Sequence, residues 1–220
     1  MSYRYLSYPL TGGTPVYGGG EGIKIKRIGG GLRQGRANLY RIRMRNHCGT
    51  HIDAPNHFFH DGKKVADYPA QDWIFRQPQV IEVSLRPGQI LQCGNWIKKI
   101  RSGVDILLFK SGWHKFRKNK KYILKNPGIH PEVGHCLKST LPRLKAIGID
   151  WVSVSSYLDR PLGREAHRAF LSSDGKRHPI LIIEDMDLSG NLTGLKEVIV
   201  SPLRVKNIDS SPCTVLGRAD

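Results

Sequence analysis

The chain has 220 residues, and we expect residues 1–220 to form a single domain. Its hydrophobic content of 39% is enough for a core, and no apolar run reaches the roughly 18–20 residues that a membrane span requires. The formal net charge of +17 favours an anionic partner, which can be nucleic acid, an anionic surface or an anionic substrate.

The N-terminal part is rich in glycine, so the first forty residues are predicted to form turns and short strands. They carry neither of the two common glycine-rich phosphate-binding patterns. Residues 39–47 then alternate between apolar and basic side chains, which predicts a half-buried strand.

Short apolar runs predict five further strands, several of them buried on both faces. These strands are expected at residues 79–85, 104–110, 150–155, 180–184 and 197–205.

One helix is predicted at residues 131–147, where apolar side chains follow helical spacing. Pro131 suits its first position, Gly148 suits its end, and Pro142 should kink the helix or split it. A second, short helix is expected at residues 94–101. Interspersed strands and helices indicate a mixed α/β domain.

Residues 115–125 carry six Lys or Arg and no acid. This pattern is typical of a solvated face or a mobile loop. Since no nucleic-acid-binding signature accompanies the segment, its charge does not by itself indicate RNA or DNA binding.

Four of the nine histidines fall within residues 47–60, and the stretch HCGTHIDAPNHF holds three of them with one aspartate. Gly49 and Pro55 oppose a helix here. A turn at Gly49 would return His51 beside His47, and alternation along an extended segment would point His51 and Asp53 the same way. Imidazole and carboxylate are ligands for zinc, iron and manganese.

Other roles for residues of this stretch remain open at the level of sequence. His57 could be a fourth ligand or a group that transfers protons near neutral pH. A nucleophilic Cys48 paired with a histidine, or a polar loop with no chemical role, are the alternatives. His60, beside Asp61, is expected to be a surface histidine.

Two distant residues could complete a site. Glu184 ends an apolar run, and an acid at the end of a buried strand is costly unless it is paired or bound to metal. It could equally emerge into solvent. His167 lies between charged residues and by itself indicates a surface position.

The stretch HCGTHIDAPNHF resembles the H-x-G-T-H-x-D-x-P-x-H-F pattern of the cyclase family, which includes bacterial kynurenine formamidases and isatin hydrolases. Further similar segments follow in the family's order: LSYPLTGGTPVYGG precedes the motif, and SGW, PGIHPE, AIGID, AHRAFL, ILIIEDMDL and SPLRVKNIDSSP come after it.

The resemblance implies an α/β fold of the swivelling β/β/α type with a mixed sheet, assembled as a homodimer or larger homo-oligomer. It also implies a catalytic role for His57 and a set of metal ligands, with Asp53 and Glu184 able to bridge two ions. The implied ligands are His47, His51, Asp53, His167 and Glu184.

The chain departs from the family pattern in several segments. The link between His167 and Glu184 is longer than usual and contains His178, a competing ligand candidate. Asp159 is a weak match to an aspartate of the family, and the lysine-rich segment 115–125 is unexpected there.

These observations predict an arylformamidase-like, metal-dependent hydrolase of amides, lactams or lactones. Its cofactor is expected to be one or two divalent ions, zinc first and manganese second. The alternatives are a metal-dependent cyclase or dehydratase, which is a lyase, and a basic nucleic-acid-binding protein on this scaffold. The substrate should be a small molecule, with an anionic one favoured by the charge. Four cysteines without metal-site spacing indicate free thiols in the cytoplasm.

Overall fold

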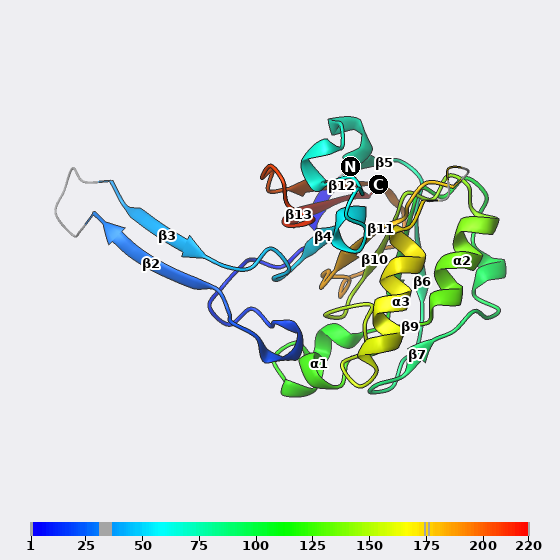
Figure 1. Cartoon of the computed structure of the whole chain (residues 1–220), viewed down its shortest axis with the longest axis horizontal. Helices are drawn as coiled ribbons and strands as arrows, with labels where there is room; N and C mark the ends of the chain where they lie inside the picture. Colours follow the sequence, from blue (N-terminus) through cyan, green and yellow to red (C-terminus); the bar gives the residue numbers. More distant parts are fainter. Residues whose placement is uncertain (1, 31–36, 174, 176, 220) are drawn as a thin grey trace.

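The computed structural model describes residues 2–30, 37–173, 175 and 177–219. The main strands and helices are arranged as Figure 1 shows. The strands are β1 (Ser2–Tyr5), β2 (Lys24–Gly29), β3 (Leu39–Arg43), β4 (His51–Asp53), β5 (Ile74–Phe75), β6 (Pro78–Glu82), β7 (Ile90–Leu91), β8 (Ile106–Lys110), β9 (Gly128–Ile129), β10 (Ala146–Ile149), β11 (Leu181–Glu184), β12 (Leu195–Pro202) and β13 (Ser210–Ala219). The α-helices are α1 (Lys120–Leu124), α2 (Pro131–Thr140) and α3 (Arg160–Leu171).

The main sheet is mixed, which confirms the predicted α/β class. Its strand order is β5-β12-β13-β4-β11-β10-β8-β6, and β1 pairs with β13. Strands β6, β8, β10 and β11 run parallel to one another, whereas β4 is antiparallel to both of its neighbours. Strand β4 therefore lies in the middle of the sheet, between a parallel half and an antiparallel half.

Helices α2 and α3 pack side by side against one face of the parallel half (Figure 1). Strand β8 illustrates the packing, because Leu107 and Phe109 belong to the core under these helices while Ile106 and Leu108 belong to the core on the other face. All four side chains are buried. The expectation that these apolar runs are strands covered on both faces is thus confirmed for 104–110.

Strands β2 and β3 form a hairpin that extends away from the main body (Figure 1). Ile25 lies opposite Ile42 and Lys26 opposite Arg41, so the hairpin has one basic face and one face that is mainly apolar but includes Arg27. The predicted alternation is correct, but the predicted burial is wrong. Tyr40 and Ile42 are 53% and 59% exposed, because no described part of the chain covers this face.

The predicted helix at 131–147 is correct only in its first part. Helix α2 ends at Thr140, before Pro142, and the apolar residues after it form strand β10. The strand predicted at 150–155 is wrong, because β10 ends at Ile149 and the residues that follow it are not in a strand. The helix expected at 94–101 is reduced to a single 3-10 turn, Ile97–Lys99.

The lysine-rich segment 115–125 is more than a solvated loop. Its lysines are largely exposed, but Arg117 donates two hydrogen bonds, of 2.9 and 2.7 Å, to the buried carboxylate of Asp185. The hydroxyl of the buried Tyr122 donates a third, at 2.6 Å. The segment is therefore anchored beside the strand that carries Glu184.

Helix α3 was not anticipated from the sequence. It begins after Asp159, whose side chain caps it by accepting a hydrogen bond from the Leu162 backbone N–H. With 12 residues it is the longest helix described, and in the described part of the chain no helix is long and apolar enough to cross a membrane.

Candidate metal centre and active site

Strand β4 brings the first group of polar side chains together. Gly49 has a φ of 66°, a conformation that favours glycine, and this turn returns His51 beside His47 as the sequence predicted. The two imidazole centroids are 5.3 Å apart. His51 and Asp53 point to the same side of β4, and Nε2 of His51 lies 3.6 Å from Oδ1 of Asp53.

Strand β11 contributes Glu184, which does not emerge into solvent. Glu184 pairs with His51 across the sheet, and its side chain is nearly fully buried. Its Oε1 accepts hydrogen bonds from the Val154 backbone N–H at 2.8 Å and from Ser153 Oγ at 3.0 Å. Its Oε2 lies 3.4 Å from Nε2 of His51. The carboxylate is thus held with Oε2 turned toward His51.

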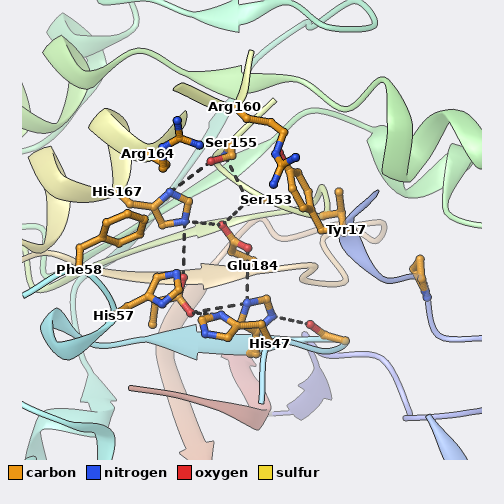
Figure 2. A pocket seen from close by; sticks show the side chains of 15 residues that line it. Tyr17, His47, His57, Phe58, Ser153, Ser155, Arg160, Arg164, His167 and Glu184 are labelled. Carbon is orange, nitrogen blue, oxygen red and sulfur yellow. Dashed lines mark hydrogen bonds and ion pairs between the residues drawn. The ribbon is translucent and has the colours of Figure 1, made fainter. Parts of the chain in front are cut away.

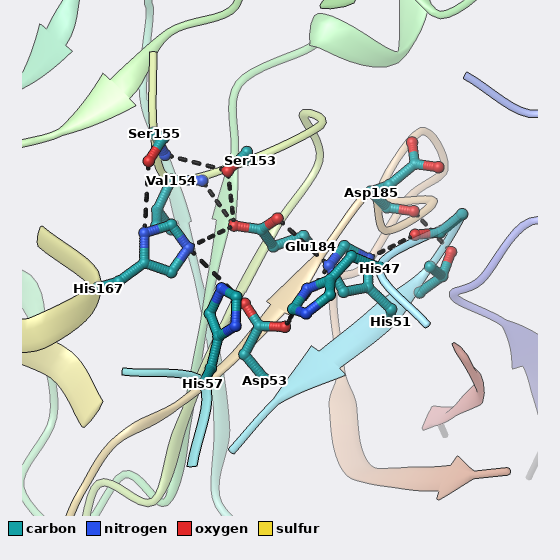
Figure 3. A network of polar contacts seen from close by, with 12 residues as sticks. His47, His51, Asp53, His57, Ser153, Val154, Ser155, His167, Glu184 and Asp185 are labelled. Atoms are coloured by element: carbon teal, nitrogen blue, oxygen red, sulfur yellow. Dashed lines mark hydrogen bonds and ion pairs between the residues drawn. The ribbon is translucent and has the colours of Figure 1, made fainter. Parts of the chain in front are cut away.

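Helix α3 brings His167 to the same point from more than a hundred residues away. His167 Nε2 lies 3.7 Å from Asp53 Oδ2 and 3.5 Å from Glu184 Oε1. Figure 3 shows the three side chains converging from the helix and from two adjacent strands. His167 is buried, so the surface position that its charged neighbours indicated is wrong.

The tautomers of two histidines follow from their carbonyl partners. Nδ1 of His51 lies 2.8 Å from the carbonyl of Gly49, and Nδ1 of His167 lies 2.8 Å from the carbonyl of Gly163. A carbonyl only accepts, so both Nδ1 atoms donate. Their Nε2 atoms then face carboxylates, which is the arrangement by which metal-ligating histidines are oriented.

Several atoms at the centre of this group are buried without a hydrogen bond. They are His51 Nε2 and both carboxylate oxygens of Asp53. The Asp53 carboxylate faces imidazole nitrogens instead, the nearest being His47 Nδ1 at 3.1 Å from Oδ1, and a buried carboxylate is costly unless a cation lies against it. A divalent cation satisfies these atoms and the donor set suits it, so the residues present fit a metal centre.

Two overlapping groups have the ligand spacing of a metal site, and Asp53 belongs to both. One group is His47, Asp53 and His57, and the other is His51, Asp53 and Glu184. A carboxylate shared by two groups is the arrangement that lets one residue bridge two ions.

Asp209, just before β13, joins His47 and His57. Its Oδ2 lies 2.6 Å from His57 Nδ1 and 3.0 Å from His47 Nε2, and its Oδ1 accepts a hydrogen bond of 2.7 Å from Asn46 Nδ2. Because β13 pairs with β4, Asp209 comes beside Asp53 through backbone pairing. Asp209 therefore sets the ring orientation of His57.

The charges of this cluster shift the pKa values of its members. Burial opposes protonation of His47, but the carboxylates of Asp53 and Asp209 outweigh it and raise the pKa of His47 to about 10. Burial opposes ionisation of Glu184, but hydrogen bonds with His167 and His51 lower its pKa to about 2. Hydrogen bonds with His47 and His57 hold the pKa of Asp209 well below its usual range. The carboxylates are therefore ionised at neutral pH.

The cluster forms one end of a pocket of about 290 Å³, which Figure 2 shows. This volume suits a small molecule. Tyr17 and Phe58 contribute aromatic surface, and Phe58 stacks on the ring of His167 at a centroid distance of 5.1 Å. Arg160 and Arg164, from the start of α3, complete the wall.

The remaining sequence candidates lie elsewhere or do not suit the chemistry. Cys48 is buried in a small apolar cluster, and burial raises the pKa of its thiol, which opposes a nucleophilic thiolate. His178 lies 3.0 Å from the Leu144 carbonyl and does not line the pocket. Asp159 caps α3, and His60 is exposed beside Asp61, as expected.

The sequence reasoning did not single out Asp209, Arg160 or Arg164. Asp209 lies within the segment SPLRVKNIDSSP, where an acid directly before a strand was the available signal. The two arginines are four residues apart, which is the spacing of one helix face, but this required the helix to be recognised first.

Known proteins resemble this chain in sequence and in fold. The Cyclase family model, described as "Putative cyclase", matches residues 5–156. A kynurenine formamidase of Bacillus cereus is 29% identical over 217 residues, covering 97% of this chain and 95% of that protein. A kynurenine formamidase of another Bacillus cereus strain is 31% identical over 188 residues, covering 84% of this chain and 81% of that protein.

Solved structures show the same fold. Isatin hydrolase A from Labrenzia aggregata, bound to benzyl benzoate, superposes with a TM-score of 0.79 at 22% identity, covering 98% of this chain and 93% of that chain. A structure described as a potential metal-dependent hydrolase with cyclase activity gives a TM-score of 0.74 at 21% identity, covering 98% of this chain and 96% of that chain. The predicted fold class is thus confirmed.

Proposed function

The chain belongs to the cyclase family, and from this premise we propose that it is a metal-dependent hydrolase of a C–N bond in a small amide or lactam. The observation that carries the proposal is Asp53, a fully buried carboxylate that is shared by two ligand groups and is surrounded by histidine nitrogens. The relatives named kynurenine formamidase and isatin hydrolase support this bond class.

The proposed ligands are the five residues that the family resemblance implied. Asp53 is the shared ligand, with His47 on one side and His51 and Glu184 on the other. His167 completes the set, because its Nε2 faces the carboxylates of both Asp53 and Glu184. We propose zinc, in one or two equivalents, with manganese as the second choice for this donor set.

A divalent ion bound here would polarise the substrate carbonyl and lower the pKa of water toward neutrality. The proposed role of His57 is to carry the proton between the attacking water and the leaving nitrogen. His57 lines the pocket, and its ring is fixed through Nδ1 by Asp209. Its Nε2 is therefore the atom available for proton transfer.

For an open-chain formamide the reaction balances simply. The water oxygen bonds to the formyl carbon, the C–N bond breaks, and the nitrogen takes up the proton that His57 delivers. The products are formate and the free amine. For a lactam the same bond change opens the ring, giving an amine and a carboxylate in one molecule.

We also propose that the chain forms a homodimer. The hairpin of β2 and β3 supports this, because Ile25, Tyr40 and Ile42 expose apolar surface on one face of a projecting arm. Size-exclusion chromatography with light scattering should give twice the monomer mass, and Ile42→Ser should shift the equilibrium toward monomer. Cytoplasmic location is supported by four cysteines that are all free thiols.

Metal analysis and one substitution test the proposed function. The purified protein, or protein reconstituted with zinc, should hold one or two equivalents and release aniline and formate from formanilide. His57→Ala should keep the metal and lose activity by about 10²–10⁴-fold, the usual contribution of acid–base catalysis.

Protein that binds no metal on reconstitution would overturn the proposal. A reaction in which the substrate loses water, instead of gaining it, would also overturn the proposal, because that outcome belongs to the dehydratase alternative. Full activity in His57→Ala would exclude the proton-transfer role alone.

A further inference from the structure

Two arginines lie on the same side of α3, at the wall of the pocket. Arg160 and Arg164 are one helical turn apart, and both line the pocket that holds the proposed metal ligands. Figure 2 shows them on the side of the pocket opposite His47, with Arg160 extending toward Tyr17. Arg164 lies about one turn before His167 on the same helix, so the positive charge lines the pocket on the side of α3.

The two guanidinium groups are not neutralised by the protein. Among the described residues, no carboxylate lies within ion-pair distance of Arg160 or Arg164. The next arginine along the helix differs, because Arg168 donates to Glu165 at 2.8 Å. A pair of arginines without acid partners, beside a small-molecule pocket, is available to a ligand.

The electrostatic effect of the arginines reaches the pocket wall. Burial raises the pKa of Tyr17 to about 12, and the positive charges of Arg160 and Arg164 act against this rise. Tyr17 lines the pocket between these arginines and the ligand cluster. The positive charge of the two arginines therefore acts inside the pocket, where a substrate would lie.

Among the described residues that line the pocket, no acid outside the proposed metal-ligand cluster could pair with these arginines. The acids of the pocket, as far as the structure describes them, are Asp53 and Glu184, and both belong to the metal-ligand cluster. Tyr17 and Phe58 offer aromatic surface between the cluster and the arginines. A planar ring can lie between these aromatic walls, with an amide directed to the ligands and an anionic group directed to the arginines.

We propose that Arg160 and Arg164 bind an anionic group of the substrate, so that this chain prefers aromatic amides bearing a carboxylate or phosphate over neutral ones. The inference rests on the proposed function and deepens it by naming the substrate class. It also assigns a local role to part of the +17 charge, whose origin the composition left open.

A matched series of formamides tests the inference through kinetics. The zinc-loaded enzyme is assayed with formanilide, 3-formamidobenzoate and 3-formamidophenyl phosphate. The wild type should favour at least one anionic substrate in kcat/KM, and the better of the two identifies the anion. In the double variant Arg160→Gln/Arg164→Gln this preference should fall by about tenfold, as expected for exposed charge-assisted hydrogen bonds. The rate with formanilide is the reference within each enzyme, so a general loss of activity cancels from the ratio.

The control is Arg143→Gln. Arg143 is exposed and does not line the pocket, so the substitution removes a positive charge without touching the wall. An equal loss of preference in Arg143→Gln would show that overall charge, and not the pair on α3, attracts the substrate. That result would overturn the inference.

A binding measurement separates this inference from the proposed reaction. 3-Acetylbenzoate and acetophenone have a ketone in place of the amide, so the enzyme cannot hydrolyse them. By calorimetry, the zinc-loaded wild type should bind 3-acetylbenzoate about tenfold more tightly than the double arginine variant does, with acetophenone equal in both.

The outcomes can be distinguished. Discrimination in binding without hydrolysis of any formamide would retain the anion site and overturn the proposed reaction. Hydrolysis of all three formamides at rates that the double variant leaves in the same ratio, with unchanged binding of 3-acetylbenzoate, would overturn the anion site alone.

Discussion

Asp209→Asn tests whether the orientation of His57 matters for the reaction. Asp209 Oδ2 lies within hydrogen-bond distance of both His57 Nδ1 and His47 Nε2. Asparagine keeps the size of the side chain but removes its negative charge. It can also turn its amide N–H toward His57, which would favour the wrong tautomer for proton transfer at Nε2.

The expected magnitude follows from the short contact with His57. A hydrogen bond to a charged group contributes about 1.5–3 kcal/mol. If that stabilisation acts when His57 is protonated during the reaction, kcat should fall by about 10–100-fold, at 1.36 kcal/mol per factor of ten. The part of the loss that acts through His57 cannot exceed that of His57→Ala, because that variant removes the ring that Asp209 positions.

The assay is steady-state hydrolysis of formanilide, with zinc content measured on the same samples. We expect kcat to fall while KM and the metal content stay at wild-type values. Asp61→Asn is the matched control, because Asp61 Oδ1 lies 2.9 Å from Nδ1 of the exposed His60, in an aspartate–histidine pair outside the site. It should leave kcat unchanged.

Two results would refute the reasoning. Activity of Asp209→Asn within about twofold of wild type would leave no room for a contribution of the size expected from this hydrogen bond. Loss of zinc from the variant would mean that Asp209 chiefly supports the ligand His47, and the fall in kcat would then report metal loss.

Three further substitutions have defined outcomes. Glu184→Gln should lose zinc during dialysis against a chelator at a concentration that the wild type withstands, since Glu184 faces both His51 and His167; retention of wild-type zinc would exclude it as a ligand. Gly163→Ala should lower the free energy of unfolding by about 1–3 kcal/mol, because the added Cβ would lie 2.1 Å from Ser155 Oγ and 2.6 Å from Ser155 Cα. Urea denaturation measures this, with Gly12→Ala as the control, where the closest contact is an ordinary 3.7 Å. Arg117→Met leaves the buried Asp185 carboxylate without its bidentate partner and should cost about 3–5 kcal/mol in the same experiment, whereas the exposed Lys118→Met should cost less than about 0.5 kcal/mol. Equal urea midpoints for Arg117→Met and Lys118→Met would show that Arg117 does not anchor the lysine-rich segment.

The geometry within residues 47–57 could be predicted because it depends on local chain stereochemistry. Gly49 permits the left-handed turn, and alternation along an extended strand turns His51 and Asp53 to one side. The apolar runs at 104–110 and 180–184 likewise have the composition of strands buried on both faces. Glu184 was a candidate from its place at the end of an apolar run, but only the family resemblance linked it and His167 to this stretch as proposed ligands.

Other features depended on contacts between segments that are far apart in the sequence. The apolar residues of 146–149 fit a continued helix as well as a strand, and pairing with β8 and β11 decided for a strand. The alternation in β3 identified its two faces but not whether anything covers them. Period and composition describe a side chain's direction, whereas burial depends on the neighbouring segments.

The sequence by itself therefore determined the nature of the site: a turn at Gly49, a histidine–aspartate cluster after it, and a mixed α/β setting. Only the tertiary structure decided the surroundings of that cluster. Pairing of β13 with β4 places Asp209 beside His57, and packing of α3 beside the sheet places His167, Arg160 and Arg164 at the pocket. The reason is physical: the direction of a side chain follows from its own backbone, but its partners follow from which strands pair and which helices pack across the whole chain.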